Sequence, residues 1–481
     1  MLPTRLAVAG FAFLLLAEIA MPALGSDWPR FRGPNGSGVS LDKATTPTAW
    51  SPKENLKWKV ALPGPGSSCP IVVGDKVFVT CWSGYAVDRG DLGDQKNLKR
   101  HLVCLDRATG KLLWDAVVAA KLPEDRYGGM FAENGYASHT PVSDGERVFA
   151  FFGKSGVVAF DMNGKQLWQT DVGDESDRRG WGTASSPILF DDLVIVTAAI
   201  ESQALIALDK TTGKEVWRKR AGGFDSTWGT PVLVKVDDKR TDLVIGVPYD
   251  VWGFDPKTGK FVWFCEAMDT DSYCSSLAVD GDMVIGIEGR GGGSIAVRAG
   301  GVDDVSKTNV VWNGRDNNRI GTPVAYEGRV YFVANKIANC IDAKTGKKIF
   351  QARLTSDSAA GEATDTAREE PAQRPGERGS GGSGGFGGGN FGGPGGGFGG
   401  GGYGGRGGRG GQDYGSPIIA DGKVYYTTRG GETFVFKAGD KFEQLAVNRM
   451  TDEAEDFSST PAAADGALFI RSSKHLYCVG K

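Results

Sequence analysis

One short stretch limits the fold more than any other feature of this chain: ALDKTTGKEVW, from Ala207 to Trp217. Close copies run from Cys104 to Trp114, Ala159 to Trp168, Gly253 to Trp263 and Cys340 to Phe350. In each copy an aspartate can accept backbone N–H bonds across a turn, a glycine can take positive φ, and an aromatic residue follows on an outgoing strand. A structural turn in a repeat protein recurs in this way, whereas a catalytic loop does not.

The TTGK portion also has the look of a phosphate-binding loop, but its spacing is wrong for one. Such a loop needs an upstream glycine, separated by four residues from the Gly-Lys pair, and a Ser or Thr after the pair. Gly213 and Lys214 lack the upstream glycine, and Glu215 stands where Ser or Thr is required. We therefore expect Lys214 to face solvent on a turn between two strands.

A second repeated element precedes each turn. It is a small-residue step ending in proline, then two apolar runs separated by an Asp/Gly turn, which reads as a pair of strands. Its copies are Ser67–Thr80, Ser138–Phe151, Ala184–Thr197, Trp228–Asp238, Ile320–Val333, Tyr414–Thr427 and Ser458–Arg471, and an eighth, Cys274–Ile287, has Leu277 in place of the proline. The prolines lie 44 to 46 residues apart where no insertion intervenes, as from Pro141 to Pro187 and from Pro187 to Pro231. Each unit then holds four short strands.

Eight such units predict an all-β fold, an eight-bladed β-propeller of four-stranded antiparallel blades, because one blade buries its faces only against its neighbours. The last unit lacks an outermost strand, and the segment Asn55–Leu62 reads as the missing one. We expect it to close the ring by joining the last, C-terminal blade, which leaves no open edge. The aromatic residues expected on the outer strands, packing between blades, are Trp58, Trp114, Trp168, Trp217, Trp263, Trp312 and Phe350.

Three segments of the chain lie outside the predicted blades: the N-terminal region, a lead-in and one insertion. Residues 1–25 read as a signal peptide cleaved near Gly25/Ser26, because a short apolar run follows Arg5 and small residues follow the run. Residues 26–54 form a lead-in segment and 55–481 a single propeller. A Gly-rich insertion over 355–413, between blades 6 and 7, predicts a flexible loop. We expect a periplasmic or secreted monomer without a transmembrane segment.

The net charge and the positions of the histidines and cysteines limit which partners and which kinds of site we expect. The net charge of −3 gives no reason to expect nucleic acid as a partner. His101, His139 and His475 are too scattered along the chain to predict a metal site. Of the seven cysteines, Cys265 and Cys274 are the best candidates for a disulfide, with a reduced pair as the alternative.

Ligands of propellers usually enter the mouth of the central channel, so the residues before each Ser/Thr-Pro step are the candidate binding site. They are Tyr136, His139, Trp181, Trp228, Tyr273, Arg319, Tyr414 and Phe457. These residues either fill and stiffen the channel neck or form a concave platform for a flat ligand, a sugar or a peptide. No catalytic residue can be assigned from the sequence.

The repeated A-x-D-x-x-T-G-K-x-x-W turn resembles the PQQ-repeat propellers, a superfamily that includes quinoprotein alcohol dehydrogenases and the outer-membrane assembly factor BamB. The resemblance covers the chain from about Asp27 to Lys481, and the lead-in DWPRFRGPNGSGVS looks like the opening of many secreted bacterial members. A BamB-like member implies a non-catalytic binding or assembly scaffold with a protein or glycan partner at the mouth and no cofactor.

A dehydrogenase, the alternative, implies PQQ on a tryptophan floor and a Ca²⁺ ion. It also implies two adjacent cysteines, which this sequence lacks. Trp181 or Trp228 could form the floor, and Arg319 could pair with a carboxylate of the quinone. A carbohydrate-binding propeller, which would stack sugars on the same aromatic residues, is a further alternative.

Overall fold

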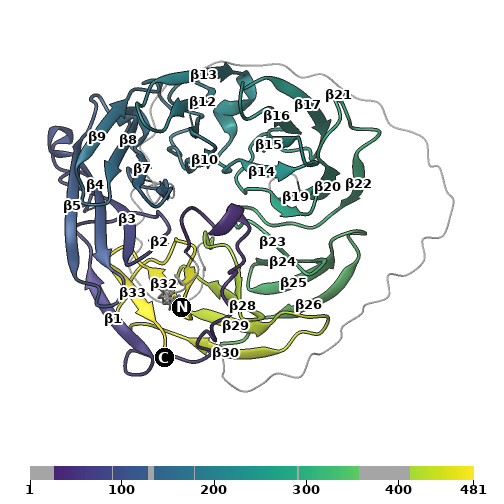
Figure 1. Cartoon of the computed structure of the whole chain (residues 1–481). Helices are drawn as coiled ribbons and strands as arrows, with labels where there is room; N and C mark the ends of the chain where they lie inside the picture. Colours follow the sequence, from purple (N-terminus) through teal and green to yellow (C-terminus); the bar gives the residue numbers. More distant parts are fainter. Residues whose placement is uncertain (1–26, 89, 128–134, 178, 290–291, 357–411) are drawn as a thin grey trace, which may run out of the picture.

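The structure is a computed structural model that describes residues 27–88, 90–127, 135–177, 179–289, 292–356 and 412–481. Eight sheets stand around a central axis like the blades of a propeller (Figure 1). Seven sheets have four strands and one has five, and nearly all neighbouring strands are antiparallel. The predicted all-β, eight-bladed fold is confirmed.

Blades 1 to 4 follow the chain in order, each from its innermost to its outermost strand. Blade 1 has β2 (Ile71–Val73), β3 (Lys76–Ser83), β4 (Lys99–Asp106) and β5 (Leu112–Ala119). Blade 2 has β6 (Val142–Ser143), β7 (Arg147–Phe151), β8 (Val157–Asp161) and β9 (Gln166–Thr170). Blade 3 has β10 (Ile188–Phe190), β11 (Leu193–Ala198), β12 (Ala204–Asp209) and β13 (Glu215–Arg220). Blade 4 has β14 (Val232–Lys235), β15 (Thr241–Val247), β16 (Asp250–Phe254), β17 (Phe261–Glu266) and an added β21 (Asp303–Asp304).

Blades 5 to 8 complete the ring. Blade 5 has β18 (Ala278–Asp280), β19 (Met283–Glu288), β20 (Gly293–Arg298) and β22 (Val310–Gly314). Blade 6 has β23 (Val324–Tyr326), β24 (Arg329–Ala334), β25 (Ile337–Asp342) and β26 (Lys348–Arg353). Blade 7 has β27 (Ile418–Ala420), β28 (Lys423–Thr427), β29 (Thr433–Lys437) and β30 (Gln444–Asn448). Blade 8 has β31 (Ala462–Ala464), β32 (Ala467–Arg471), β33 (His475–Val479) and β1 (Leu56–Ala61). The described helices are short 3₁₀ turns: η1 (Pro34–Gly36), η2 (Gln95–Asn97), η4 (Gly153–Ser155) and η5 (Gly222–Ser226).

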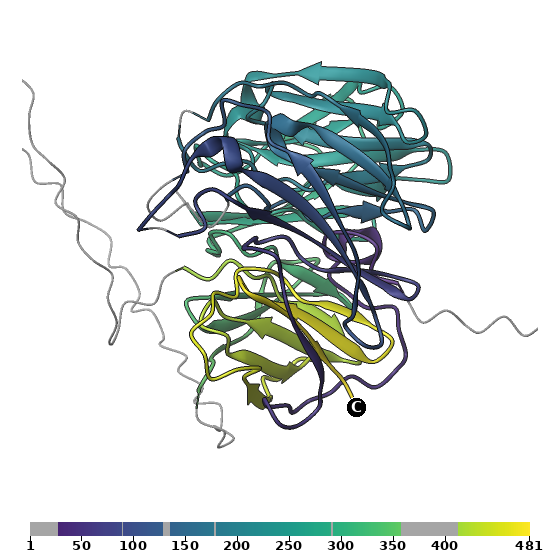
Figure 2. The ribbon, with the colours of Figure 1, turned by 90° about the vertical axis from the view of Figure 1, so that its left-hand side faces the viewer.

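The two ends of the chain share blade 8. Strand β1 pairs antiparallel with β33, so that Trp58 lies opposite Cys478 and Ala61 opposite His475. Figure 2 shows the purple N-terminal segment beside the yellow C-terminal blade. The predicted ring closure is therefore present, and its hydrogen bonds join segments about as far apart as the chain allows.

The repeated turn has the geometry that its residues favour. Asp209 accepts the backbone N–H groups of Thr211 and Thr212 at 3.1 and 2.7 Å, and Gly213 has φ 71°. The Gly213 N–H donates to the Asp209 carbonyl at 2.8 Å, and Lys214 is exposed. Each such turn ends one strand and starts the outermost strand of its blade.

The turn glycine also receives a tryptophan from the preceding blade. The ring of Trp168 lies so close to Gly213 that a Cβ atom there would be 2.5 Å from the ring, and its indole N–H donates to the Lys210 carbonyl at 3.2 Å. The same contact recurs between Trp58 and Gly110, Trp114 and Gly164, Trp217 and Gly259, and Trp312 and Gly346. The repeated Gly and Trp are thus two halves of one contact between blades.

Trp263 of blade 4 makes a different contact because blade 5 has no such turn. Its ring covers Gly253 of its own blade, where a Cβ atom would be 2.1 Å away, and its indole N–H donates to the Asp242 carboxylate at 2.7 Å. The residues after β20 instead form a loop whose short strand β21 adds to β17, with Asp303 opposite Trp263. Where the repeat is lost, the tryptophan remains buried by packing within its blade.

The lead-in lies across the central channel. We call residues 27–40 the crossbar. At one end Trp28 pairs with Val72 of blade 1, and at the other the Ser40 N–H donates to the Ile419 carbonyl of blade 7 at 2.8 Å. Its turn η1 lies near the centre of the ring in Figure 1. The crossbar therefore joins blades 1 and 7, which flank blade 8, by way of the middle of the ring.

Two further expectations concern the ends and the cysteines. The signal peptide over 1–25 and nearly all of the Gly-rich insertion over 355–413 lie outside the described residues. All seven cysteines are free, so the Cys265–Cys274 disulfide that we considered is wrong. Cys265 is buried on β17, near the outer edge of its blade, whereas Cys274 lies at the central channel. Within the described part of the chain, no helix combines the length and hydropathy that a bilayer crossing requires.

Candidate functional site

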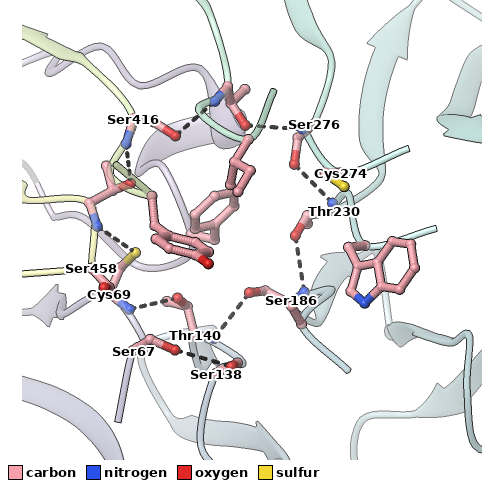
Figure 3. Close-up of a pocket in the computed structure, with 17 residues that line it drawn as sticks. Ser67, Cys69, Ser138, Thr140, Ser186, Thr230, Cys274, Ser276, Ser416 and Ser458 are labelled. Atoms are coloured by element: carbon pink, nitrogen blue, oxygen red, sulfur yellow. Dashed lines mark hydrogen bonds between the residues drawn. The ribbon is translucent and has the colours of Figure 1, made fainter. Parts of the chain in front are cut away.

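A closed ring of hydrogen bonds surrounds the channel where the innermost strands begin (Figure 3). Each blade contributes one residue just before its first strand, and its backbone N–H donates to the side chain of the corresponding residue of the next blade. The members in order are Cys69, Thr140, Ser186, Thr230, Ser276, Thr322, Ser416 and Thr460. Seven links are 2.9 to 3.0 Å long, and the link from the Thr460 N–H to Cys69 Sγ is 3.2 Å.

The ring explains why a small hydroxyl residue recurs just before the innermost strand in seven of the eight blades. An innermost strand has no further strand on its channel side, so its first buried N–H group needs a side-chain acceptor. A hydroxyl oxygen supplies that acceptor without filling the channel, whereas Cys69 supplies a sulfur, which is a weaker one. The ring therefore links all eight blades at the mouth.

The ring encloses a small cup, a cavity of about 110 Å³. Phe31 of the crossbar lines it, together with Trp228, Ile320 and Tyr414 above or beside the ring hydroxyls. Pockets that hold cofactors and drug-sized ligands are commonly about 300–1,000 Å³. The cup has space for water molecules or one small chemical group.

Two of the eight predicted site residues, Trp228 and Tyr414, line this cup. The Trp228 indole N–H donates to the Gly182 carbonyl at 2.7 Å, and the indole lies 4.8 Å from that of Trp181, centroid to centroid. The Arg179 guanidinium lies 5.4 Å from the Trp181 ring. These contacts form a partly exposed aromatic patch beside the cup.

Four other predicted residues lie in the core behind the cup. They are Tyr136, His139, Tyr273 and Phe457, each at most 3% exposed. Tyr273 occupies space left by Gly246 and Gly286, where Cβ atoms would come within 2.4 and 2.2 Å of it. Burial lowers the pKa of His139 to about 3, so this imidazole is neutral at physiological pH. The sequence predicts these residues near the mouth. It does not predict that their side chains are buried, because burial depends on packing between blades.

Arg319, the remaining predicted residue, is half-buried beside blade 5. A Cβ atom at Gly289 would lie 2.6 Å from the Arg319 Cα atom, so this glycine gives the chain room to pass. The positive charge of Arg319 opposes the effect of burial on the Glu288 carboxyl, although burial dominates and raises the pKa of Glu288 to about 7.

Two buried glutamates are functional candidates that the sequence reasoning missed. Glu288 accepts backbone N–H bonds from Cys274 and Gly289, both at 2.9 Å. Glu201 is 2% exposed, its Oε2 atom has no hydrogen-bond partner, and burial raises its pKa to about 7. The sequence did contain a pattern that could have indicated them: each glutamate ends an apolar run, VTAAIE for Glu201 and MVIGIE for Glu288.

A larger groove opens beside the cup at the seam of blades 8 and 1. We call it the mouth groove; its volume is about 580 Å³. Its lining residues are Ala61, Leu62, Gly64, Pro65, Gly66, Ser67, Trp82, Ala86, Val87, Asp456, Ser458, Ser473, Lys474 and His475. Ser67 and Ser458 line both the groove and the cup, so the two spaces adjoin. Its apolar wall includes Val87, which is 53% exposed.

Comparison with known proteins identifies the family. The sequence matches the family described as outer membrane protein assembly factor BamB over residues 83–200 and 153–368. These matches together span more than half of the chain. The chain belongs to this family.

Relatives of this family member include enzymes. It is 25% identical to polyvinylalcohol dehydrogenase of Sphingopyxis sp. (strain 113P3) over 52% of the chain and 40% of that protein. It is 32% identical to 1-butanol dehydrogenase (quinone) of Thauera butanivorans over 27% of the chain and 23% of that protein. The chain therefore spans less than half the length of these curated relatives.

Solved structures share the propeller fold with this family member at low sequence identity. BamB from Moraxella catarrhalis matches with a TM-score of 0.52 at 10% identity, over 89% of this chain and 99% of that chain. A europium-containing methanol dehydrogenase matches with a TM-score of 0.57 at 11% identity, over 95% and 98% of the two chains. Likeness at this level shows the fold alone.

The residues at the mouth fit a quinone and its metal poorly. Two aspartates there already accept backbone N–H bonds: Asp177 accepts the Gly182 N–H at 2.8 Å, and Asp413 accepts the Arg429 N–H at 2.8 Å. Among the described residues, no three His, Cys, Asp or Glu side chains are grouped closely enough to hold a metal ion. The cup is also smaller than a tricyclic cofactor requires.

Proposed function

We propose that this chain is an exported, non-catalytic binding scaffold that holds a protein partner at the channel mouth. The observation that carries the proposal is the mouth groove, an apolar space of about 580 Å³ that adjoins the cup through Ser67 and Ser458. A groove of this kind buries apolar side chains of a partner, and the adjoining hydroxyl ring can receive a polar group.

The lining of the groove suits an extended segment of a partner. Leu62, Pro65, Trp82 and Val87 contribute apolar side chains to it, and Lys474 contributes a positive charge. The Trp82 backbone N–H donates to the Pro65 carbonyl at 3.0 Å, which fixes the segment around Pro65 against strand β3. A preformed groove costs little ordering on binding, which favours a scaffold role. The match to the BamB family supports the same role.

A charge placed in the groove tests this proposal. A Val87→Glu variant introduces a carboxylate where the partner's apolar side chain would be buried, at a cost of a few kcal/mol. Val302→Glu is the matched control, because Val302 is 64% exposed and lies outside the groove. Peptides selected from a random library on the wild-type protein should bind Val302→Glu unchanged and Val87→Glu at least tenfold more weakly. Equal binding to both variants would rule out the groove as the site.

A quinone-dependent dehydrogenase is the second candidate, favoured by the two dehydrogenases among the relatives. It predicts that PQQ with Ca²⁺ raises the unfolding midpoint in a saturable way, because a ligand of the folded state stabilises it. The rise should be lost in Trp228→Ala and should accompany dye-linked oxidation of alcohols. No rise at high ligand excess would remove this candidate.

A further inference from the structure

The crossbar carries two buried arginines whose surroundings differ. Arg30 is 7% exposed and Arg32 is 1% exposed, and neither forms an ion pair with a carboxylate of a residue that the structure describes. Buried guanidinium groups are normally paired, because a charge removed from water is costly. The two side chains come from the same short segment, so their hydrogen bonds can be compared directly.

Arg32 is fully satisfied without a carboxylate. Its N–H groups donate to five backbone carbonyls, those of Gly36, Ser37, Thr322, Pro323 and Pro417, at 2.7 to 3.4 Å. A guanidinium has five N–H donors in all. Arg32 is therefore a structural link between the crossbar and blades 6 and 7.

Arg30 has no equivalent partners. No hydrogen bond or ion pair joins its side chain to any described residue, and its enclosed Nε atom is unpartnered. Burial lowers the pKa of Arg30 to about 10, with no nearby carboxylate opposing the shift, so the group still carries its charge at neutral pH. An uncompensated cation thus lies inside the crossbar.

The backbone makes room for this guanidinium. A Cβ atom at Gly36 would lie 3.2 Å from Arg30 Nη2, and Gly36 has φ 68°. Gly33 and Gly38 make room in the same way for Trp28 and Arg32, with Cβ distances of 2.5 and 2.4 Å. Each glycine of the segment RGPNGSG therefore packs against one side chain of the preceding segment WPRFR. Of these three side chains, Arg32 is hydrogen-bonded, the Trp28 indole N–H has no partner, and Arg30 is the charged group without a partner among the described residues.

We propose that the crossbar binds a small oxyanion at Arg30. A guanidinium presents parallel N–H donors that match a carboxylate or phosphate group, and a charge-assisted pair of this kind is strongest away from water. Arg32 adds a second positive charge two residues away, although its own donors are all used. Because Arg30 is only 7% exposed, the ligand is a small anion such as formate or inorganic phosphate. This inference does not rest on the proposed scaffold role.

Thermal unfolding at constant ionic strength tests the site. Formate and inorganic phosphate are titrated separately into the mature protein, which distinguishes a planar carboxylate from a tetrahedral oxyanion. The wild type should show a saturable rise of the unfolding midpoint with at least one anion. Arg30→Met should lose this rise, and Arg179→Met, which removes a half-exposed arginine at the mouth, should keep it.

Two results would overturn the proposal. One is the absence of any saturable rise in the wild type, and the other is a rise of equal size in Arg30→Met. If Arg30→Met does not fold, Arg30→Lys keeps the positive charge but loses the parallel donors. That variant should bind the anion at least tenfold more weakly, and unchanged binding would equally exclude a guanidinium site.

Discussion

The contact between Trp58 and Gly110 helps to hold the seam between blades 8 and 1, and an added methyl group tests it. A Cβ atom at Gly110 would lie 2.7 Å from Trp58 Cδ2, and Gly110 has φ 72°. Gly110→Ala therefore adds two costs. One is the strain of an alanine at positive φ, about 1–2 kcal/mol, and the other is displacement of a packed ring, about 1–3 kcal/mol.

Gly422 separates the two costs, because it has φ 65° and no atom would lie within 4 Å of an added Cβ. Gly422→Ala should lose about 1–2 kcal/mol, and Gly110→Ala about 2–5 kcal/mol, as measured by urea unfolding with linear extrapolation. In a Trp58→Ala background the cost of Gly110→Ala should fall to that of Gly422→Ala, a coupling of about 1–3 kcal/mol. Equal losses for the two glycines, or full additivity in the double variant, would refute the ring-on-glycine explanation of the repeat.

Three further changes test other parts of the structure. Cys69→Ala leaves the Thr460 N–H without its acceptor and should cost about 1–3 kcal/mol, whereas Cys69→Ser keeps an acceptor and should cost less, by urea unfolding. Burial raises the pKa of Glu201 from an unfolded value near 4.3 to about 7, so the folded state binds this proton more tightly and stability falls as pH rises between these values. Glu201→Gln cannot ionise and should gain up to about 3 kcal/mol relative to wild type at pH 8, with little gain at pH 4, by chemical denaturation at both pH values. Lys214→Ala should change the free energy of unfolding by less than about 0.5 kcal/mol, while Trp217→Ala should cost about 3–5 kcal/mol; similar losses would contradict the turn assignment.

The candidate site was only partly predictable. The sequence pointed to the entry of each innermost strand, and the mouth does lie there, with Trp228 and Tyr414 on the cup. It did not indicate that Tyr136 and His139 would be buried, since that depends on contacts with other blades. Nor did it indicate that seven hydroxyls and the Cys69 sulfur would form one closed ring, because each link joins residues 44 to 94 positions apart, or 391 at the closure.

What the sequence determined by itself was local and repeated. The Asp, Gly and aromatic residues of each turn act within a few positions of one another, so their spacing predicts the turn and the strands around it. Counting these units predicts eight blades, and the orphan strand around Trp58 predicts the closure between β1 and β33. These features follow from backbone preferences and from the need of each blade for neighbours.

What only the tertiary structure decided depends on contacts across the ring. Trp263 has the same motif position as Trp217, yet it packs within its own blade because blade 5 offers no glycine to receive it. Arg30 and Arg32 are two residues apart, yet carbonyls about 290 and 385 positions away satisfy Arg32 and leave Arg30 without a partner. Burial and hydrogen-bond satisfaction are properties of groups brought together by the closed ring, so no local pattern encodes them.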